Sequence, residues 1–359
     1  MNTTPLAYQL SGHITAEAPL NVSYFGMDER LPRTPHGQVF LNGGTLRGPL
    51  RKAGLNMLIR ELASLKDQPL DLVFNRAQMY MLGEGIDVSR DVNNEAMGRN
   101  YDPRAEAFLR QTNPFMSLFG RWKLAGYLEV GPLLTSTSNL ITAGQGVRHD
   151  QFEHDPRLVT YLSADEQAAL MDQMRSTQES MTAIEEVREQ IRLIKADARK
   201  TDDVAARQAF AKQTRELEAQ EKAIRKQREG SEESIKHPLP GYEAIAPGSQ
   251  LQSRLKLIEG SPEILGLLLH CLAEFSHHPR LGGHLANGFG AISAEWQVMQ
   301  RSPGERQAEA IGMVRLDDMG ITLEGEPLEQ AWQAFKVTLP SYDFTLFSRQ
   351  EARQRWKQR

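Results

Sequence analysis

Two stretches of the sequence combine glycine with polar or basic residues in a pattern typical of phosphate-binding loops. Residues 40–51 are Phe-Leu-Asn-Gly-Gly-Thr-Leu-Arg-Gly-Pro-Leu-Arg, and residues 281–290 are Leu-Gly-Gly-His-Leu-Ala-Asn-Gly-Phe-Gly. The first stretch precedes an amphipathic segment, which places it at the start of a helix, where backbone N–H groups and the helix dipole favour phosphate. Together the two stretches predict a pair of backbone loops that grip one polyanion.

The basic charge of the chain is concentrated in one window. Between Arg30 and Arg60 there is no aspartate or glutamate. The whole chain has a formal net charge of −4 and a pI near 6.2, which excludes a protein that binds nucleic acid through overall basic charge. Counterions are released only where a cation lies close to a phosphate, so a basic groove on an acidic body suffices. The basic residues of the window are Arg30, Arg33, Arg47, Arg51, Lys52 and Arg60.

Other residues that could do chemistry are few. His149, Asp150, Glu153, His154 and Asp155 are of the types that bind metals. Their spacing matches neither a helical His-x-x-x-His pair nor a zinc finger, so the pattern does not favour a metal site. No Ser-His-Asp arrangement can be assigned from isolated residues. We therefore expect no bound metal, no cofactor and no catalytic residue.

The elements that would position the two loops alternate between strand and helix patterns. Ser261 with Pro262 is typical of a helix start, with proline at the first helical position. The order strand, helix, strand, then strand, helix, strand predicts an α+β fold with a ferredoxin-like (RRM-like) core, whose sheets commonly hold single-stranded RNA. The expected strands cover residues 6–15, 37–41, 118–134, 250–259 and 291–298, and the expected helices cover 45–65 and 262–275.

Residues 163–230 have a different character from the rest of the chain. Ser163 and Glu166 form a capping box, and apolar residues then recur at three-and-four spacing. The polar segment 201–203 lies between two such runs and can cap the second, which predicts two antiparallel helices packed as a hairpin. We interpret this hairpin as a structural insertion rather than an RNA-binding element. It could contact a neighbouring subunit.

Composition limits the class of protein. The chain has 359 residues, and its hydrophobic content of 40% excludes a disordered chain. Its single cysteine, Cys271, lies in an apolar run and predicts a buried thiol in a reducing compartment. No stretch approaches the roughly 18 to 20 apolar residues of a membrane helix, so we expect a cytoplasmic protein with no membrane partner. The basic residues Arg353, Arg355, Lys357 and Arg359 are interpreted as a solvated tail.

Three ordered motifs resemble a known family. The string at 40–51 resembles the signature "apolar, Pro-Gly-Ser-Ser-Leu-Lys/Arg-Gly, Leu-Arg" of CRISPR RAMP proteins, and residues 282–290 resemble their C-terminal glycine-rich loop. Ser-Leu-Phe-Gly at 117–120, followed by Gly-Tyr-Leu-Glu-Val at 126–130, resembles the Leu-Phe-Gly element of the same superfamily. The chain departs from the signature at Asn42, where proline is usual, and at Gly44-Thr45, where two serines are usual. The order and spacing of the three motifs are most similar to those of the Cas-seven-like backbone subunits, and among these to those of the type IV member.

The resemblance implies a function in antiviral defence. Such a subunit binds guide RNA (crRNA) and oligomerises along it as a helical filament inside a type IV CRISPR effector ribonucleoprotein. Its expected partners are crRNA, other copies of itself, other type IV effector subunits, and target nucleic acid recognised by guide pairing. The protein would hold phosphates without reading bases, because sequence is read by base pairing. We accordingly expect a binding protein and not an enzyme.

The resemblance also implies a division of the chain. Residues 1–65, 118–160 and 240–300 would form the RRM-like palm, residues 66–117 a finger-like insertion, residues 163–230 the helical hairpin, and residues 301–359 a C-terminal extension. The polar segment 134–150 is either the start of a thumb-like element or an ordinary surface loop. The residues expected to bind RNA are Arg33, Asn42, Gly43, Gly44, Thr45, Arg47, Arg51, Lys52, Arg148, Gly282, Gly283, His284, Asn287, Gly288 and Phe289.

Two alternatives to this function stay open at the level of sequence. Asp28 resembles in position an aspartate with which type III backbone subunits cleave target RNA, which would make the protein a metal-dependent endoribonuclease. A loop carboxylate paired with Arg30 or Arg33 is the interpretation we favour. The other alternative is a coiled-coil adaptor whose glycine loops are only tight turns.

Overall fold

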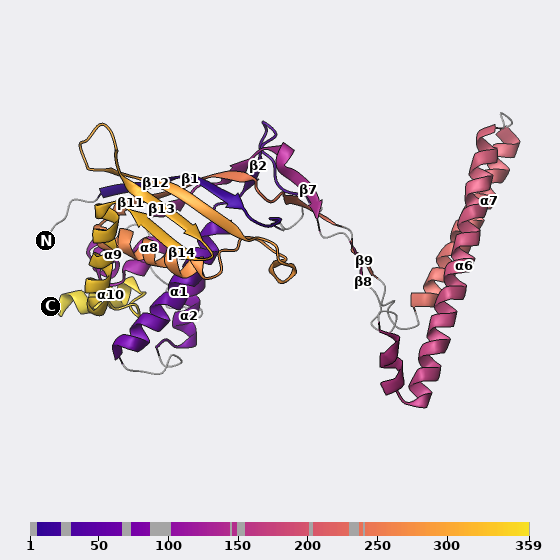
Figure 1. Ribbon diagram of the computed structural model, residues 1–359, viewed down its shortest axis with the longest axis horizontal. Coiled ribbons are helices and arrows are strands. Elements are labelled where there is room, and N and C mark those ends of the chain that lie inside the picture. The colour runs from indigo at the N-terminus through magenta and orange to yellow at the C-terminus, as the bar shows by residue number, and fades with distance from the viewer. Residues whose placement is uncertain are drawn as a thin grey trace. The chain divides into compact units, whose positions relative to one another are not determined.

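The computed structural model describes residues 6–22, 30–66, 73–86, 102–143, 146–148, 155–200, 204–229, 237–239 and 241–358. The chain divides into two compact units (Figure 1). Met1–Ala143 and Tyr242–Arg359 form the first unit, and Gly144–Gly241 form the second. The first unit combines an antiparallel sheet with helices, which confirms the predicted α+β class.

The main sheet of the first unit is built from β1 (Leu6–Ala16), β2 (Val39–Leu41), β5 (Leu128–Val130), β6 (Leu133–Thr135), β11 (Gln250–Gly260), β12 (Ile292–Arg301), β13 (Glu309–Asp317) and β14 (Gly320–Glu324). The strand order is β14-β13-β12-β1-β11-β6-β2, and β5 also pairs with β11. β1 lies at the centre, with Leu10 opposite Leu255 of β11 and Val298 of β12. The strands expected near 6–15, 37–41, 250–259 and 291–298 are therefore confirmed.

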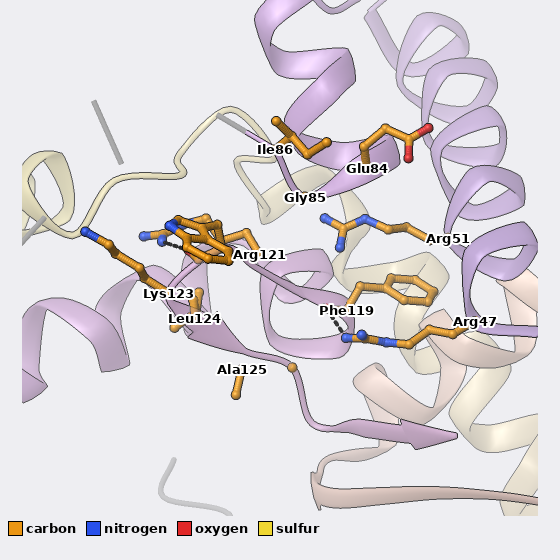
Figure 2. Close-up of a pocket in the computed structure, with 12 residues that line it drawn as sticks. Arg47, Arg51, Glu84, Gly85, Ile86, Phe119, Arg121, Lys123, Leu124 and Ala125 are labelled. Carbon is orange, nitrogen blue, oxygen red and sulfur yellow. Dashed lines mark hydrogen bonds between the residues drawn. The ribbon is translucent and has the colours of Figure 1, made fainter. Parts of the chain in front are cut away.

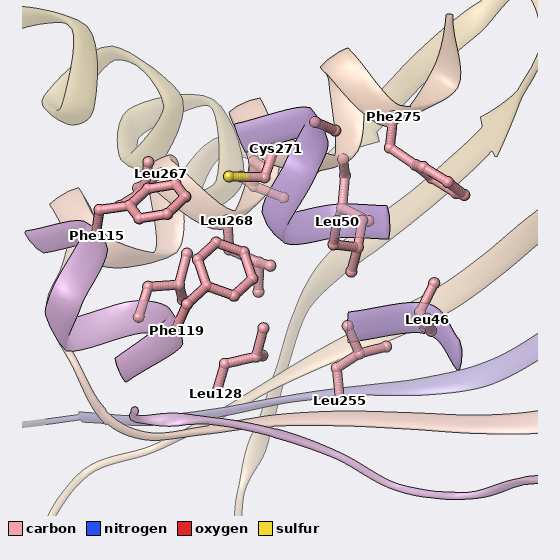
Figure 3. Packing of buried hydrophobic residues seen from close by; sticks show 14 of the residues in the cluster. Leu46, Leu50, Phe115, Phe119, Leu128, Leu255, Leu267, Leu268, Cys271 and Phe275 are labelled. Carbon is pink, nitrogen blue, oxygen red and sulfur yellow. The ribbon is translucent and has the colours of Figure 1, made fainter. Parts of the chain in front are cut away.

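Helices cover one face of this sheet, namely α1 (Gly44–Lys66), α8 (Pro262–Ser276) and α9 (Glu326–Thr338). Alternate residues of the central strands point into the core beneath them, where Figure 3 shows Leu50 of α1 and Cys271 of α8 among the buried side chains. Each fully buried Leu or Phe contributes about 1.5–3 kcal/mol. The helices expected at 45–65 and 262–275 are confirmed, as is the burial of Cys271.

The opposite face of the central strands is polar. Gln9, Ser11 and His13 of β1 alternate with buried neighbours, and residues 252, 254 and 256 of β11 are Gln, Arg and Lys. On β12 the outward residues 295 and 297 are Glu and Gln. Phe, Tyr and Trp are thus absent from the outward positions within residues 9–13 of β1, 252–256 of β11 and 295–297 of β12.

The single strand expected over 118–134 is wrong. Residues 118 and 119 end α4 (Pro114–Phe119), which Asn113 begins by accepting a hydrogen bond from the Met116 N–H at 3.2 Å and which Gly120 ends with a φ of 66°. A small hairpin of β3 (Gly120–Arg121) and β4 (Leu124–Ala125) follows, and only β5 and β6 join the main sheet. Between α1 and α4 lie α2 (Arg76–Glu84) and α3 (Pro103–Thr112).

Residues 301–358, expected as a C-terminal extension, belong to the body of the first unit. β13 and β14 extend the main sheet, and α9 packs on α8 so closely that a Cβ at Gly266 would lie 2.0 Å from the Ala331 carbonyl oxygen. The last helix, α10 (Arg349–Lys357), packs on α3. Arg353 pairs with Asp102 at 3.2 Å and Arg355 with Asp343 at 2.6 Å. The tail interpretation of these arginines is therefore wrong, since acidic partners distant in sequence hold them.

The second unit is dominated by α6 (Ala164–Lys200) and α7 (Val204–Glu229), which pack on each other as the predicted hairpin. The capping box is present, because the Glu166 N–H donates to Ser163 Oγ at 3.3 Å and the Ser163 N–H donates to Glu166 Oε2 at 3.0 Å. Ion pairs between Arg188 and Glu221 at 2.9 Å and between Lys195 and Glu218 at 3.0 Å cross the hairpin.

The remaining short elements are β7 (Leu140–Ala143) paired with β10 (Tyr242–Ile245), β8 (Gly146–Arg148) paired with β9 (His237–Leu239), and the 3-10 turns η3 (Thr137–Asn139), η4 (Pro156–Tyr161), η5 (Leu285–Asn287) and η6 (Leu339–Ser341). Within the described part of the chain, no helix is both long and apolar enough to span a membrane.

Candidate nucleic-acid interface

The turn between β2 and α1 carries the first predicted phosphate loop. Asn42 begins the helix by accepting the Gly44 N–H at 3.1 Å through its side chain and the Thr45 N–H at 2.8 Å through its carbonyl oxygen. The Arg47 N–H donates to the Gly43 carbonyl oxygen at 3.0 Å. These amides are bonded within the turn, so contacts to an anion at this end of α1 would come mainly from side chains.

The two glycines of this turn have different roles. A Cβ at Gly43 would lie 2.1 Å from the Val130 carbonyl oxygen at the end of β5, so this position requires glycine for close approach of the two backbones. At Gly44 the nearest heavy atom to a Cβ would be Asn42 Oδ1 at 3.8 Å, and the residue is exposed. Gly43 therefore fixes the start of α1 against the sheet, whereas Gly44 belongs to the surface.

Arg47 and Arg51 extend from α1 toward the same space (Figure 2). Arg47 donates from Nη2 to the Phe119 carbonyl oxygen, and its buried Nε has no hydrogen-bond partner among the described residues. Arg51 is buried, and it donates from Nε to the Leu82 carbonyl oxygen and from Nη2 to the Met81 carbonyl oxygen at 2.7 Å. Arg51 therefore closes the last turn of α2, a structural role that the sequence did not indicate.

Burial perturbs the pKa of both guanidinium groups, and like charge perturbs that of Arg51 as well. Burial lowers the pKa of Arg47. Burial lowers the pKa of Arg51 to about 10, the charge of Arg47 adds to this effect, and the carboxylate of Glu84 opposes it. Glu84 also pairs with Lys52 at 3.4 Å. The site thus holds more positive than negative charge in a partly desolvated setting, where an anion would be attracted strongly.

These arginines line a cavity of about 630 Å³ between α1, the end of α2 and the β3–β4 hairpin. Of the described residues that line it, four are cationic and one is a carboxylate. The lining residues are Arg47, Arg51, Glu84, Gly85, Ile86, Phe119, Arg121, Trp122, Lys123, Leu124, Ala125 and Gly126. The net positive lining suits a phosphate or another anionic group.

The β3–β4 hairpin supplies three of these residues from its tip. Arg121 is buried and donates from Nη1 to the Trp122 carbonyl oxygen at 2.7 Å. Trp122 is 64% exposed. Lys123 adopts a left-handed φ of 61°, a conformation that favours glycine, in the two-residue turn of the hairpin. Sequence reasoning missed this group, although a Trp between Arg and Lys directly after the Leu-Phe-Gly element was a usable signal.

The glycine-rich loop at 281–290 is anchored on the chain after β1. The Gly283 N–H donates to the Asn21 carbonyl oxygen at 2.9 Å, and the Gly290 N–H donates to the Pro19 carbonyl oxygen at 2.9 Å. Gly282 has a φ of 83°, and a Cβ there would lie 2.1 Å from the Asn21 carbonyl oxygen, so glycine is required for this contact. The tip of the loop, including Asn287 and Gly288, is exposed.

Aromatic side chains of this loop pack on β10. The imidazole of His284 stacks on Tyr242 with ring centroids 4.0 Å apart. Phe289 meets the edge of Tyr242 at 6.4 Å and is only 8% exposed. Phe289 was expected to contact RNA, and its burial instead makes it part of the packing that holds the loop.

Arg33 reaches the same strand. Its guanidinium pairs with Glu243, whose other carboxylate oxygen accepts the Leu31 N–H at 2.7 Å. Asn21 donates from Nδ2 to the Glu243 carbonyl oxygen at 2.8 Å. The structure therefore brings Arg33 and the glycine-rich loop together on β10, while Gly43 and Arg47 face β5 and the β3–β4 hairpin.

Several expected residues lie outside the described part of the chain, namely Asp28, His149, Asp150, Glu153 and His154. Arg148 lies in β8, and its side chain is likewise outside the description. Asp155 pairs with Arg157 at 2.7 Å. Among the described residues, no group of three or more His, Cys, Asp or Glu side chains is arranged to hold a metal ion.

The chain has structural neighbours among solved structures. No protein-family model matches the chain, and no curated protein matches it in sequence. A chain of a solved structure described as a Type IV-B CRISPR Complex is similar over 84% of this chain and 93% of its own length, with 12% sequence identity and a TM-score of 0.31. A likeness at this level carries no argument about function.

Proposed function

We propose that the protein is a guide-RNA-binding backbone subunit of a type IV CRISPR effector ribonucleoprotein. It binds crRNA phosphates, oligomerises along the guide, and leaves base recognition to pairing between guide and target. The observation that carries this proposal is the cationic cavity at the start of α1, where Arg47 and Arg51 lie beside Lys123 and Arg121, and where Glu84 is the one carboxylate among the described lining residues. The three motifs in the sequence add to it.

The electrostatics of this cavity favour a phosphodiester. Among the described residues, neither Arg47 nor Arg51 has a carboxylate within ion-pair distance, and their proximity disfavours the charged form of Arg51. A phosphate placed between guanidinium groups would offset both the burial and the repulsion, and charge-assisted hydrogen bonds to phosphate are among the stronger polar contacts. Contacts of this kind position a strand without reading its sequence.

The fold supports the same function. In the first unit the succession β1, α1, β5, then β11, α8, β12 places β12, β1, β11 and β5 side by side. This is the order expected of a ferredoxin-like core, which often carries single-stranded RNA. The exposed tip of the glycine-rich loop and the cavity at α1 would then be two points of contact along one guide. We propose binding alone, without chemistry, for these residues.

RNA binding by the purified full chain tests the proposal. We expect single-stranded RNA to bind with an affinity that falls as salt rises, and Arg47→Gln to weaken it about tenfold and reduce the salt slope by about 1. Lys212→Gln removes the same charge from an exposed position of α7 and should leave affinity unchanged. The absence of binding at low salt, or equal effects of the two variants, would contradict the proposal.

Assembly along the guide needs a separate measurement. The mass of the ribonucleoprotein, measured by light scattering with guides of increasing length, should rise in steps of one subunit. A complex that stays at one subunit per guide whatever its length would rule out the backbone role while leaving RNA binding intact.

A further inference from the structure

Trp122 is a large aromatic side chain held at an exposed position. It is 64% exposed at the tip of the β3–β4 hairpin, and it lines the cavity that also contains Arg47 and Lys123. Tryptophan is buried to a large extent in most proteins, so an indole left in solvent beside a cluster of cations points to a ligand. The ligand would combine a flat apolar face with negative charge.

The backbone around Trp122 is fixed on every side. The Trp122 N–H donates to the Gly85 carbonyl oxygen at 3.0 Å, and its own carbonyl oxygen accepts from Arg121 Nη1 at 2.7 Å. The next carbonyl oxygen, that of Lys123, accepts from Arg349 Nη2 at 2.8 Å. The exposure of the indole therefore does not come from a loose turn. A turn whose backbone is preorganised in this way loses little conformational entropy on binding.

The central strands β1, β11 and β12 of the main sheet offer no equivalent surface. Its polar face carries Gln, Ser, His, Arg, Lys and Glu at the outward positions of β1, β11 and β12 described above, and no Phe, Tyr or Trp. Proteins that hold unpaired bases usually stack them on aromatic side chains. If the protein holds a single strand, an aromatic contact must come from outside these three strands, and Trp122 lines the same cavity as the arginines that would take the phosphate.

We propose that Trp122 stacks on an unpaired base of the bound strand while Arg47 and Lys123 hold the adjacent phosphate. The cavity, at about 630 Å³, falls in the size range of small-molecule sites, about 300–1,000 Å³, and can admit one nucleotide. The ligand is thus a nucleotide of a single strand, and a duplex, whose bases are stacked on each other, cannot supply it. This inference rests on the proposed RNA-binding function and adds the contact that distinguishes single-stranded from paired nucleic acid.

The test compares variants of the full chain by fluorescence anisotropy with a labelled single-stranded RNA, the same strand in a duplex, and an abasic strand of equal length. We expect Trp122→Ala to weaken single-strand binding about tenfold, with Trp122→Phe closer to the parent. For the duplex, the parent and Trp122→Ala should have the same affinity. The same should hold for the abasic strand. Met319→Ala, which truncates an apolar side chain that is 90% exposed in another hairpin, should change nothing.

The outcomes separate this inference from the proposed function. If the parent binds RNA and Arg47→Gln weakens it while Trp122→Ala does not, the stacking inference fails and the proposed function stands. If the parent binds no RNA, the proposed function itself fails. If Trp122→Ala changes the oligomeric mass of the protein in the absence of RNA, the indole contacts a second copy of the chain, and the inference is overturned. Melting temperatures of all variants verify that they are folded.

Discussion

Arg47 and Arg51 lie one turn apart on α1, and the charge of Arg47 helps to lower the pKa of Arg51 to about 10. The two guanidinium groups are nevertheless held differently. Arg51 is bonded to the carbonyl oxygens of Met81 and Leu82 at the end of α2, whereas the Nε of Arg47 is buried without a partner among the described residues. One arginine therefore serves the fold, and the other is available to a ligand.

This difference predicts opposite consequences of two similar substitutions. Arg51→Ala should lower the free energy of unfolding by about 2–4 kcal/mol, because it removes the donor of the buried Leu82 carbonyl oxygen, leaves the Met81 carbonyl oxygen with the Gly85 N–H alone, and opens space beside Phe115. Arg47→Ala removes a repulsive charge along with one hydrogen bond, so its effect should stay within about 1 kcal/mol. Urea denaturation measures both. Equal losses would mean that Arg47 is also structural, and would remove it from the candidate interface.

The two glycines at the start of α1 give a second matched pair. Gly43→Ala would place a Cβ 2.1 Å from the Val130 carbonyl oxygen, and moving β5 away should cost about 3 kcal/mol. Gly44→Ala has open space and should be neutral or stabilise the helix by up to about 1 kcal/mol. Thermal denaturation of both variants measures the difference. A stable Gly43→Ala protein would show that the close approach of α1 to β5 is not needed.

His270 predicts a pH dependence of stability. It stacks on Trp332 with ring centroids 3.6 Å apart, and burial lowers its pKa to about 4, opposed by its hydrogen bond to the Trp332 carbonyl oxygen and reinforced by the charges of Lys336 and Arg60. The unfolded chain has the ordinary pKa of about 6.5, so between these values the unfolded state binds more protons and stability falls as pH falls. The stabilisation is complete above pH 6.5 and should decrease by about 2–3 kcal/mol as pH approaches 4.

The measurement is the free energy of unfolding against pH for the parent and for His270→Gln. Carboxylates titrate in the same range and affect both proteins, so the difference between the two curves isolates the imidazole. Parallel curves would show that His270 gains its proton in the folded state without cost.

Sequence predicted the elements whose signals are local. Ser261 accepts the Ile264 N–H at 3.4 Å and Pro262 follows at the first helical position, as expected for the start of α8. Ser163 and Glu166 form the predicted capping box of α6. Alternation of apolar and polar residues likewise located β1 and β11, because one face of each is buried.

The parts that sequence did not predict depend on contacts between distant residues. Arg51 is buried because α2, some thirty positions later, ends against it, and nothing in residues 73–86 has a periodicity that reveals this. Phe289 is buried because Tyr242, which follows the second unit in the sequence, packs against it. The role of 309–324 in the main sheet was missed for the same reason, since pairing of β13 with β12 is a property of register and not of composition.

The two positions at which the chain leaves and re-enters the first unit predict that the second unit can be removed. Ala143 and Tyr242 are opposite each other in the antiparallel pair β7–β10, so the segment between them leaves and re-enters the first unit at adjacent positions. Replacing residues 144–241 by a short turn such as Asn-Gly would preserve that pairing, because such turns join antiparallel strands directly. None of the described residues that line the cavity of Arg47 and Trp122 lies in the removed segment. The shortened protein should melt cooperatively and bind single-stranded RNA with an affinity within about threefold of the parent, a difference below 1 kcal/mol.

Arg47→Gln in the shortened protein should still weaken binding. If the shortened protein folds but loses RNA affinity, the helical hairpin itself contacts RNA, and the interpretation of the second unit as a structural insertion is wrong.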